Sequence, residues 1–170
     1  MARPIAVLAS MEQESRLIEA RLHRPAEHNK GGRRYVTGTL SGRPVVTAIS
    51  GYGKVAAAAT VASVLEVFSP SHVLFGGVAG GIGAGVDIGD IVIADTLVQH
   101  DFDASPLFER FVIPSLGVAA VVTDPDLTDG LHAAAQTYLH GPFRYEVTED
   151  GLDLFAPGQT KVHRGLVASG

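Results

Sequence analysis

The most informative part of the chain is the stretch 76–85, which reads Gly76-Gly77-Val78-Ala79-Gly80-Gly81-Ile82-Gly83-Ala84-Gly85 and follows directly on the apolar run His72-Val73-Leu74-Phe75. Six of the chain's twenty glycines lie in this stretch. A solvated turn seldom carries Val, Ala and Ile so densely. Because glycine has no Cβ, a buried strand that ends in such residues lets a small molecule approach main-chain N–H groups closely. The stretch therefore predicts a ligand contact at the end of a buried strand.

Short apolar runs alternate with helical patterns along the rest of the chain. The sequence predicts helices over 11–23, 54–68 and 124–140 and strands over 4–9, 34–40, 44–50, 73–75, 90–94, 118–123 and 162–168. Ser10 is expected to cap the first helix, and the apolar composition of 54–68 predicts a helix packed against a sheet over most of its circumference. The strands 34–40 and 44–50 are expected to form a hairpin through Ser41-Gly42. This alternation predicts an α/β fold, a three-layer sandwich whose central sheet is mixed and largely parallel.

Length and composition bound the class of protein. The 170 residues fit a single domain over 1–170, and 46% apolar against 18% charged residues exclude a disordered coil. The net charge of -5 gives no reason to expect nucleic acid as a partner. The one basic cluster, Lys30 with Arg33 and Arg34, is interpreted as a solvated turn.

The residue inventory also limits cofactors and compartment. The chain has no cysteine, which excludes disulfides and thiolate metal sites and favours the reducing cytoplasm. Its seven histidines lack the spacing of a metal site, so we expect no metal and no other cofactor. No apolar run reaches the length of a membrane span, and we expect no contact with a membrane.

One motif has the pattern of a dinucleotide-binding loop. Gly51-Tyr52-Gly53-Lys54-Val55-Ala56 fits G-x-G-x-x-A between a predicted strand and a predicted helix. The acidic residue that would hold the ribose is missing, because 73–76 reads Val-Leu-Phe-Gly. A phosphate-binding P-loop would need Ser or Thr after Lys54, where the chain has Val55. Both nucleotide-dependent readings are therefore disfavoured.

Several motifs taken together carry a family resemblance. In order along the chain they are Ala9-Ser10-Met11-Glu12-Gln13-Glu14, Ser50-Gly51-Tyr52-Gly53-Lys54-Val55-Ala56-Ala57-Ala58, the loop 76–81, and Gly89-Asp90-Ile91-Val92-Ile93-Ala94-Asp95 with His100-Asp101-Phe102-Asp103 behind it. This set resembles the nucleoside phosphorylase and nucleosidase superfamily, most closely its 5'-methylthioadenosine/S-adenosylhomocysteine nucleosidases. The terminal stretch 164–170 is similar to the strand before that family's purine-binding loop.

The resemblance implies hydrolysis of the N-glycosidic bond of a purine nucleoside with a 5'-thioether, with release of adenine. Such a reaction needs a base for the attacking water and an acid for the departing purine. Glu14 matches the family's water-activating carboxylate. The positions matching substrate contacts are Met11, Tyr52, Val78, Ala79 and Gly80. The family more often has a small aliphatic residue at Tyr52 and a serine at Val78.

The resemblance also implies a homodimer. Leu107 and Phe108 follow a segment that reaches across the family's dimer interface to cap the partner's 5' pocket, whereas a local core cluster is the alternative for these side chains. Asp90 and Asp95 are expected to be structural. The family's purine-protonating Asp and its ribose-gripping Met-Glu pair would lie beyond Gly170. We therefore expect a C-terminally truncated member of the fold that is inactive, or nearly so, by itself.

Other functions stay open from the residues. A phosphorylase would use phosphate in place of water, but Arg16, Arg21, Arg33 and Arg34 do not match the family's phosphate motifs, which favours hydrolysis. A futalosine-type nucleosidase and an inactive nucleoside-binding fragment are the remaining alternatives.

Overall fold

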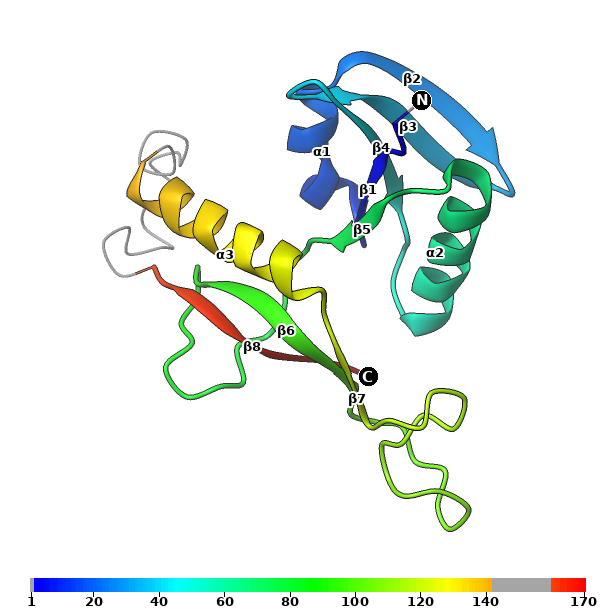
Figure 1. Ribbon diagram of the computed structural model, residues 1–170, viewed down its shortest axis with the longest axis vertical. Helices are drawn as coiled ribbons and strands as arrows, with labels where there is room; N and C mark the ends of the chain where they lie inside the picture. The colour runs from blue at the N-terminus through cyan, green and yellow to red at the C-terminus, as the bar shows by residue number, and fades with distance from the viewer. Residues whose placement is uncertain (1, 142–159) are drawn as a thin grey trace. The chain divides into compact units, whose positions relative to one another are not determined.

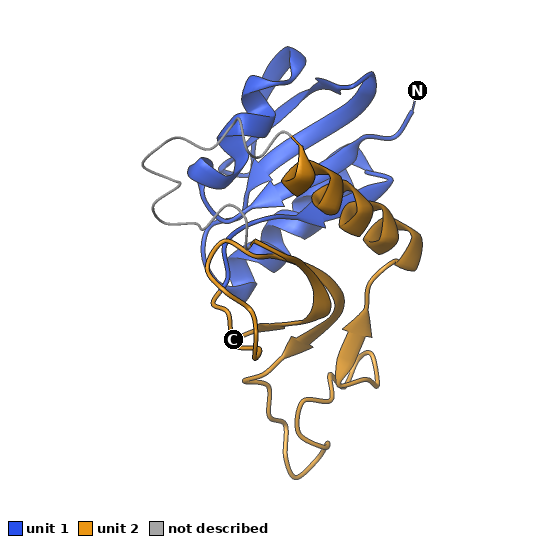
Figure 2. Ribbon diagram, turned by 90° about the vertical axis from the view of Figure 1, so that its left-hand side faces the viewer, with its two compact units in different colours: residues 1–79 blue, residues 80–170 orange. Residues whose placement is uncertain are grey.

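A computed structural model describes residues 2–141 and 160–170 of the chain. The chain divides into two compact units, residues 1–79 and residues 80–170, coloured separately in Figure 2. Each unit has its own sheet. The single domain expected over 1–170 stays a prediction.

The first unit is built on a five-stranded sheet. Its strands are β1 (Ile5–Ala9), β2 (His23–Lys30), β3 (Arg33–Leu40), β4 (Arg43–Ile49) and β5 (His72–Phe75), in the order β2-β3-β4-β1-β5. β1 pairs in parallel with both β4 and β5, whereas β2, β3 and β4 form two successive antiparallel hairpins. The expected hairpin of β3 and β4 is confirmed.

Two helices cover the two faces of this sheet, α1 (Glu12–Ala20) and α2 (Lys54–Phe68), as Figure 1 shows. Since successive side chains of a strand point to opposite faces, β1 contributes side chains to the packing on both faces of the sheet. On the α2 face, a buried cluster contains Ala6, Leu8, Tyr35, Val46, Ala48 and Val64. On the other face, Leu22 packs with Val36 and Val45. Burying each Leu or Val side chain stabilises the unit by about 1.5–3 kcal/mol. The first unit is thus a three-layer α/β/α structure.

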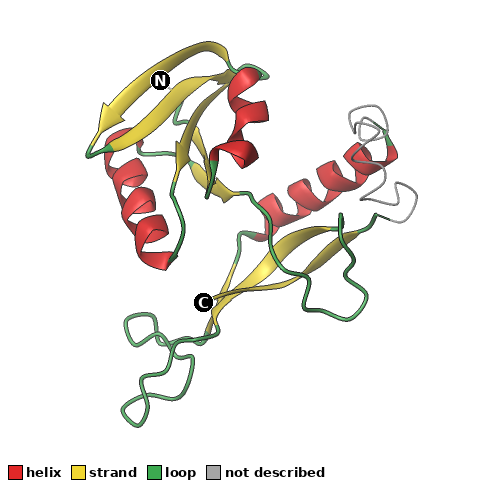
Figure 3. Ribbon diagram, turned by 180° about the vertical axis from the view of Figure 1, so that it is seen from behind, coloured by secondary structure: helices red, strands yellow, loops and turns green. Residues whose placement is uncertain are grey.

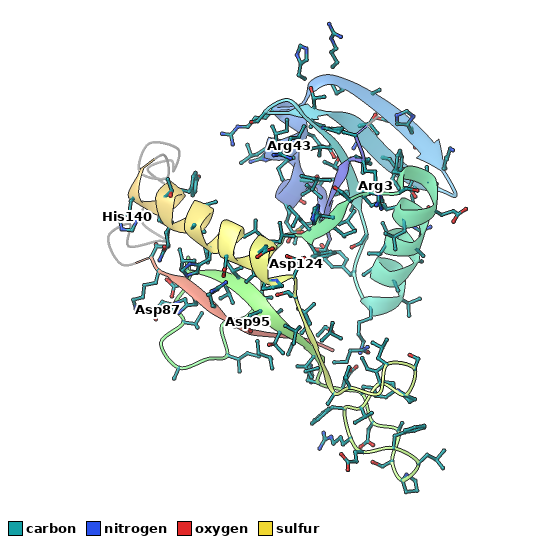
Figure 4. All side chains as sticks on the ribbon, in the orientation of Figure 1. Arg3, Arg43, Asp87, Asp95, Asp124 and His140 are labelled. Atoms are coloured by element: carbon teal, nitrogen blue, oxygen red, sulfur yellow. The ribbon has the colours of Figure 1, made fainter. Side chains whose placement is uncertain are left out.

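α2 has the predicted bounds but not the predicted packing. It ends where Ser69 adopts a left-handed conformation with φ of 45°. The guanidinium of Arg3, labelled in Figure 4, donates to the carbonyl oxygens of Ser69 and Pro70 at 2.8 and 2.7 Å. The expectation that α2 is covered over most of its circumference is wrong, because Val55 and Leu65 are exposed on its outer side.

The segment between α1 and β3 differs from the prediction. α1 ends at Ala20, and the chain enters β2 at His23 instead of continuing the helix to that residue. β2 has no apolar alternation, since all its residues are exposed at the edge of the sheet. Ser10 was expected to cap α1, but the N-cap is Met11 and the Ser10 hydroxyl donates to Glu14 instead.

In the described part of the second unit, a three-stranded sheet is covered by one helix. Its elements are β6 (Ile91–Gln99), β7 (Ala120–Val122), α3 (Pro125–His140) and β8 (Val162–Ser169), in the strand order β7-β6-β8. β6 runs parallel to β8 and antiparallel to β7. The Asp124 carboxylate accepts from the Leu127 N–H at 2.9 Å and begins α3, which packs against β6 and β8 (Figure 3).

The predicted class of fold is confirmed by these elements. Among the described strands, three pairings are parallel and three are antiparallel, so the mixed character is clear. Within the part of the chain that the structure describes, no helix has the length and apolar character needed to cross a membrane.

Candidate functional site

The candidate site lies in the first unit, at the carboxyl ends of its three parallel strands. Backbone hydrogen bonds hold these ends together beyond the strands themselves: the Ser50 N–H donates to the Ala9 oxygen at 2.8 Å and the Gly76 N–H to the Leu8 oxygen at 2.9 Å. Three loops therefore leave the sheet side by side. In open α/β sheets this edge is where ligands usually bind.

Glu14 is the charged side chain at the centre of this edge. It lies in the first turn of α1, and its carboxylate reaches back over the start of the helix. Oε2 accepts hydrogen bonds from the Ser10 N–H at 2.9 Å, the Ser10 hydroxyl at 2.7 Å and the Met11 N–H at 3.1 Å. Oε1 accepts from the Val78 N–H at 3.0 Å. The carboxylate thus joins the loop after β1 to the loop after β5.

The glycine stretch approaches this carboxylate closely. A Cβ built on Gly77 would lie 2.7 Å from Glu14 Oε1, which is closer than real Cβ contacts. Gly76 has open space at the same position. A side chain at Gly77 would therefore require the Glu14 carboxylate to move from its observed position, while the backbone conformation of Gly77 itself does not demand glycine.

Hydrogen bonding keeps Glu14 ionised. Its partial burial raises the pKa, but the Ser10 hydroxyl and the N–H groups of Val78, Met11 and Ser10 outweigh that effect and lower the pKa of Glu14 below its ordinary value. Each of these groups donates to the charged form, which is the form they stabilise. An ionised carboxylate in this position can accept a proton from a bound water molecule.

Of the other predicted site residues in the first unit, some contact Glu14 directly and others do not. The Tyr52 hydroxyl donates to the Met11 sulfur at 3.8 Å, while 77% of the tyrosine remains exposed. Val78 presents its N–H to Glu14 and its side chain, 82% exposed, to solvent. Ala79 follows it and is also exposed. The structure therefore brings together Glu14, Met11 and Val78, with Tyr52 attached through Met11.

A cavity of about 450 Å³ borders the same edge of the sheet. It is lined by Glu12, Gly32, Arg33, Arg34, Ile49, Ser50 and Gly51. The exposed turn predicted here lies at Gly31-Gly32, and the two arginines follow it on β3 with partners within the same unit. Arg33 donates to the Thr60 hydroxyl at 2.9 Å, and Arg34 pairs with Glu19 and Glu27 at 3.1 and 2.8 Å.

The remaining predicted residues belong to the second unit. Gly80 is its first residue and is exposed. Leu107 is 84% and Phe108 45% exposed, so they do not form a buried local cluster. Their assigned function of capping a partner's pocket stays a prediction, as do the site functions of Glu14 and its neighbours.

The two aspartates expected to be structural occupy different positions in the second unit. Asp90 accepts from the N–H groups of Asp87 and Lys161 and from His163. Asp95 lies on β6, as Figure 4 shows, and lines a cavity of about 220 Å³ with Thr123, Thr128, Asp129 and Arg164 among others. Arg164 and Asp129 form an ion pair there.

Two contacts of the candidate site were not predicted from the sequence. Neither the Ser10 hydroxyl contact nor the steric need for Gly77 was assigned. The signal for Ser10 was its place four residues before Glu14, at the turn into α1, where a side chain can meet the carboxylate.

Comparison with known proteins identifies the family of the chain. Residues 4–170 match the family model described as the phosphorylase superfamily. A 5'-methylthioadenosine/S-adenosylhomocysteine nucleosidase from Anoxybacillus flavithermus is 30% identical over 169 residues, covering 89% of this chain and 73% of that protein.

Solved structures of named nucleosidases share the fold of this chain. The nucleosidase of that name from Neisseria meningitidis, in complex with methylthio-immucillin-A, is 29% identical with a TM-score of 0.82. The one from Colwellia psychrerythraea, in complex with adenine, is 26% identical with a TM-score of 0.78. They align with 99% and 100% of this chain, which spans 64% and 63% of theirs. The chain belongs to the phosphorylase superfamily.

Proposed function

We propose that this protein hydrolyses the N-glycosidic bond of 5'-methylthioadenosine and S-adenosylhomocysteine, with release of adenine. The observation that carries this proposal is the ionised Glu14 carboxylate, hydrogen-bonded to the Val78 N–H of the glycine stretch at 3.0 Å. The named relatives support the choice of substrate, since they are 5'-methylthioadenosine/S-adenosylhomocysteine nucleosidases and one of them holds adenine.

The proposed reaction needs one base on the sugar side. The bond between the sugar's anomeric carbon and the purine nitrogen breaks, and its electron pair goes to the purine. A water oxygen bonds to the anomeric carbon while one proton of that water passes to the Glu14 carboxylate. The purine takes up a proton from an acid or from solvent, so that the products are free adenine and the free sugar.

Water is favoured over phosphate as the acceptor by the neighbours of Glu14. All hydrogen bonds that the described residues make to its carboxylate come from backbone N–H groups or a hydroxyl. A phosphate dianion would be held by cationic side chains. The two arginines of the nearby cavity are already engaged, Arg33 by Thr60 and Arg34 by glutamates. A water molecule needs no such cation.

We further propose that the protein is a homodimer and that it is cytoplasmic. The outer side of α2 carries an exposed apolar stripe, defined by Val55, Ala58, Ala59, Ala62 and Leu65. Exposed apolar patches of this kind mark contact surfaces between proteins. The absence of cysteine supports a reducing compartment.

Product analysis tests the reaction. The 170-residue chain, and the product of any longer reading frame that contains it, are incubated with methylthioadenosine, with and without phosphate, and the products are separated by chromatography. Adenine with methylthioribose in both conditions supports hydrolysis. A phosphorylated sugar formed only with phosphate would identify a phosphorylase, and no product from either protein would indicate a nucleoside-binding function. Futalosine as a parallel substrate tests the futalosine-type alternative.

A further inference from the structure

The two oxygens of the Glu14 carboxylate have unequal surroundings. Oε2 accepts three hydrogen bonds, two from Ser10 and one from Met11. Oε1 accepts one, from Val78. A carboxylate offers about four acceptor positions over its two oxygens. The lone pairs of Oε2 are therefore occupied, and those of Oε1 are not.

Ser10 supplies the shortest of these contacts. Its hydroxyl lies 2.7 Å from Oε2, and it is the one side chain among the described residues that donates to Glu14. Hydrogen bonds to a charged acceptor are shorter and stronger than those between neutral groups. The contact fixes the rotation of the carboxylate. It thereby makes Oε1 the oxygen that points away from the start of α1.

The cap of α1 does not require this hydroxyl. A glutamate in the first turn commonly accepts from the N–H of the N-cap residue, which here is the bond from Met11 at 3.1 Å. That bond, and the one from the Ser10 N–H, come from the backbone and would survive loss of the hydroxyl. The Ser10 hydroxyl is therefore not needed to begin α1, and its contact acts on the Glu14 carboxylate alone.

We propose that Ser10 is a positioning residue that occupies Oε2, so that Oε1 is the oxygen of Glu14 that takes the proton from water. This inference rests on the proposed hydrolysis. The position of Oε1 agrees with it, because this oxygen lies against the glycine stretch, where a Cβ on Gly77 would come within 2.7 Å. Val78 holds Oε1 by its backbone, so the exposed side chain of Val78 takes no part in that contact.

The test uses Ser10→Ala, with Ser10→Thr as the conservative variant and Ser71→Ala as the matched control. Ser71 is an exposed serine of the same unit whose hydroxyl donates to the Pro4 oxygen, away from Glu14. In the enzyme assay, we expect Ser10→Ala to lower kcat about tenfold with little change in KM, since it removes one hydrogen bond to a charged group. The acid limb of its pH profile should move to higher pH. Ser10→Thr should restore both, and Ser71→Ala should match the wild type.

A second readout does not depend on turnover. The side-chain carboxyl ¹³C signal of Glu14, assigned by its loss in Glu14→Gln, is titrated by NMR in the 170-residue chain. We expect the pKa of Glu14 to be higher in Ser10→Ala than in the wild type and unchanged in Ser71→Ala. An unchanged titration and pH profile in Ser10→Ala would overturn the inference. If the titration moves but no wild-type protein releases adenine, the proposed function fails while the contact between Ser10 and Glu14 stands.

Discussion

The contact between Gly77 and Glu14 shows how one missing side chain shapes the candidate site. The two residues are far apart in sequence, yet the backbone at Gly77 passes so close to Oε1 that a Cβ would fit only if the Glu14 carboxylate moved. The same approach lets the Val78 N–H reach that oxygen. At the scale of single residues, the function proposed for Glu14 therefore depends on a glycine that has no functional group of its own.

Gly77→Ala tests this dependence. The added methyl group would displace the Glu14 carboxylate and break its bond to the Val78 N–H, so we expect adenine release to fall by at least tenfold. Gly76→Ala is the matched control, because a Cβ there meets open space and the backbone at Gly76 needs no positive φ. Steady-state kinetics of the two variants separate the outcomes. Equal activity of both variants would show that the close approach at Gly77 does not matter.

The residues of the site were predictable where they lie next to each other in a motif. Glu14 and Met11 come from one short segment and Val78 from another, and the structure brings these together. The Gly77 contact was not predictable, because it depends on how two distant loops leave the sheet. The Ser10 hydroxyl was assigned to the helix N-terminus, since a serine before a helix usually accepts from the backbone, whereas here it donates to a carboxylate.

At the scale of elements, Asp90 joins the start of β6 to the start of β8. Its side chain is fully buried and accepts from the Lys161 N–H at 2.7 Å, the Asp87 N–H at 3.0 Å and the His163 ring at 2.6 Å. Burial raises the pKa of Asp90, but these hydrogen bonds and the charge of His163 outweigh it and lower the pKa to about 2. The ionised form is thus the one that holds the two strands in register.

This lowered pKa predicts a pH dependence of stability. Asp90 in the unfolded chain has an ordinary pKa of 3.8, so its contribution is fully present above that value and is lost as the pH falls towards 2. Asp90→Asn should reduce the free energy of unfolding of the second unit by about 1–3 kcal/mol at pH 7 and remove part of the acid dependence. Urea denaturation between pH 2 and pH 7 measures both effects. Asp126→Asn, at an exposed position in the first turn of α3, is the control. If the two variants unfold alike at every pH, Asp90 does not have this structural function.

The elements were predictable where the hydrophobic pattern is strong. α2 was placed with its observed bounds and α3 within one residue, because an Ala-rich run and an Asp-Pro start mark them clearly. β2 was missed because an exposed edge strand needs no apolar face, and its sequence includes Pro25. α1 was placed too long because Leu22, which suits a helical stripe, is buried beside the sheet after the helix has ended.

At the scale of the whole molecule, the exposed stripe of α2 predicts self-association. Its apolar residues face away from the sheet of their own unit, and Val55 is 85% exposed. A glutamate at Ala62 in the middle of the stripe would place a charge in the proposed interface. We expect the wild type to be a dimer and Ala62→Glu to be a monomer by light scattering. Asn29→Glu, on the exposed edge strand β2, is the control and should remain dimeric. A monomeric wild type, or a dimeric Ala62→Glu, would contradict this interface.

The proposed base is tested most sharply by the turnover of Glu14→Gln, made in the form of the protein that releases adenine in the product analysis. Glutamine keeps the size of the side chain and cannot accept a proton from water at neutral pH. We therefore expect adenine release from methylthioadenosine to be abolished while binding of a nucleoside analogue is nearly unchanged. Asp126→Asn, which removes an exposed carboxylate from α3, should leave the rate at the wild-type level. Release of adenine by Glu14→Gln at a rate close to that of the wild type would contradict the proposal that this carboxylate activates the attacking water.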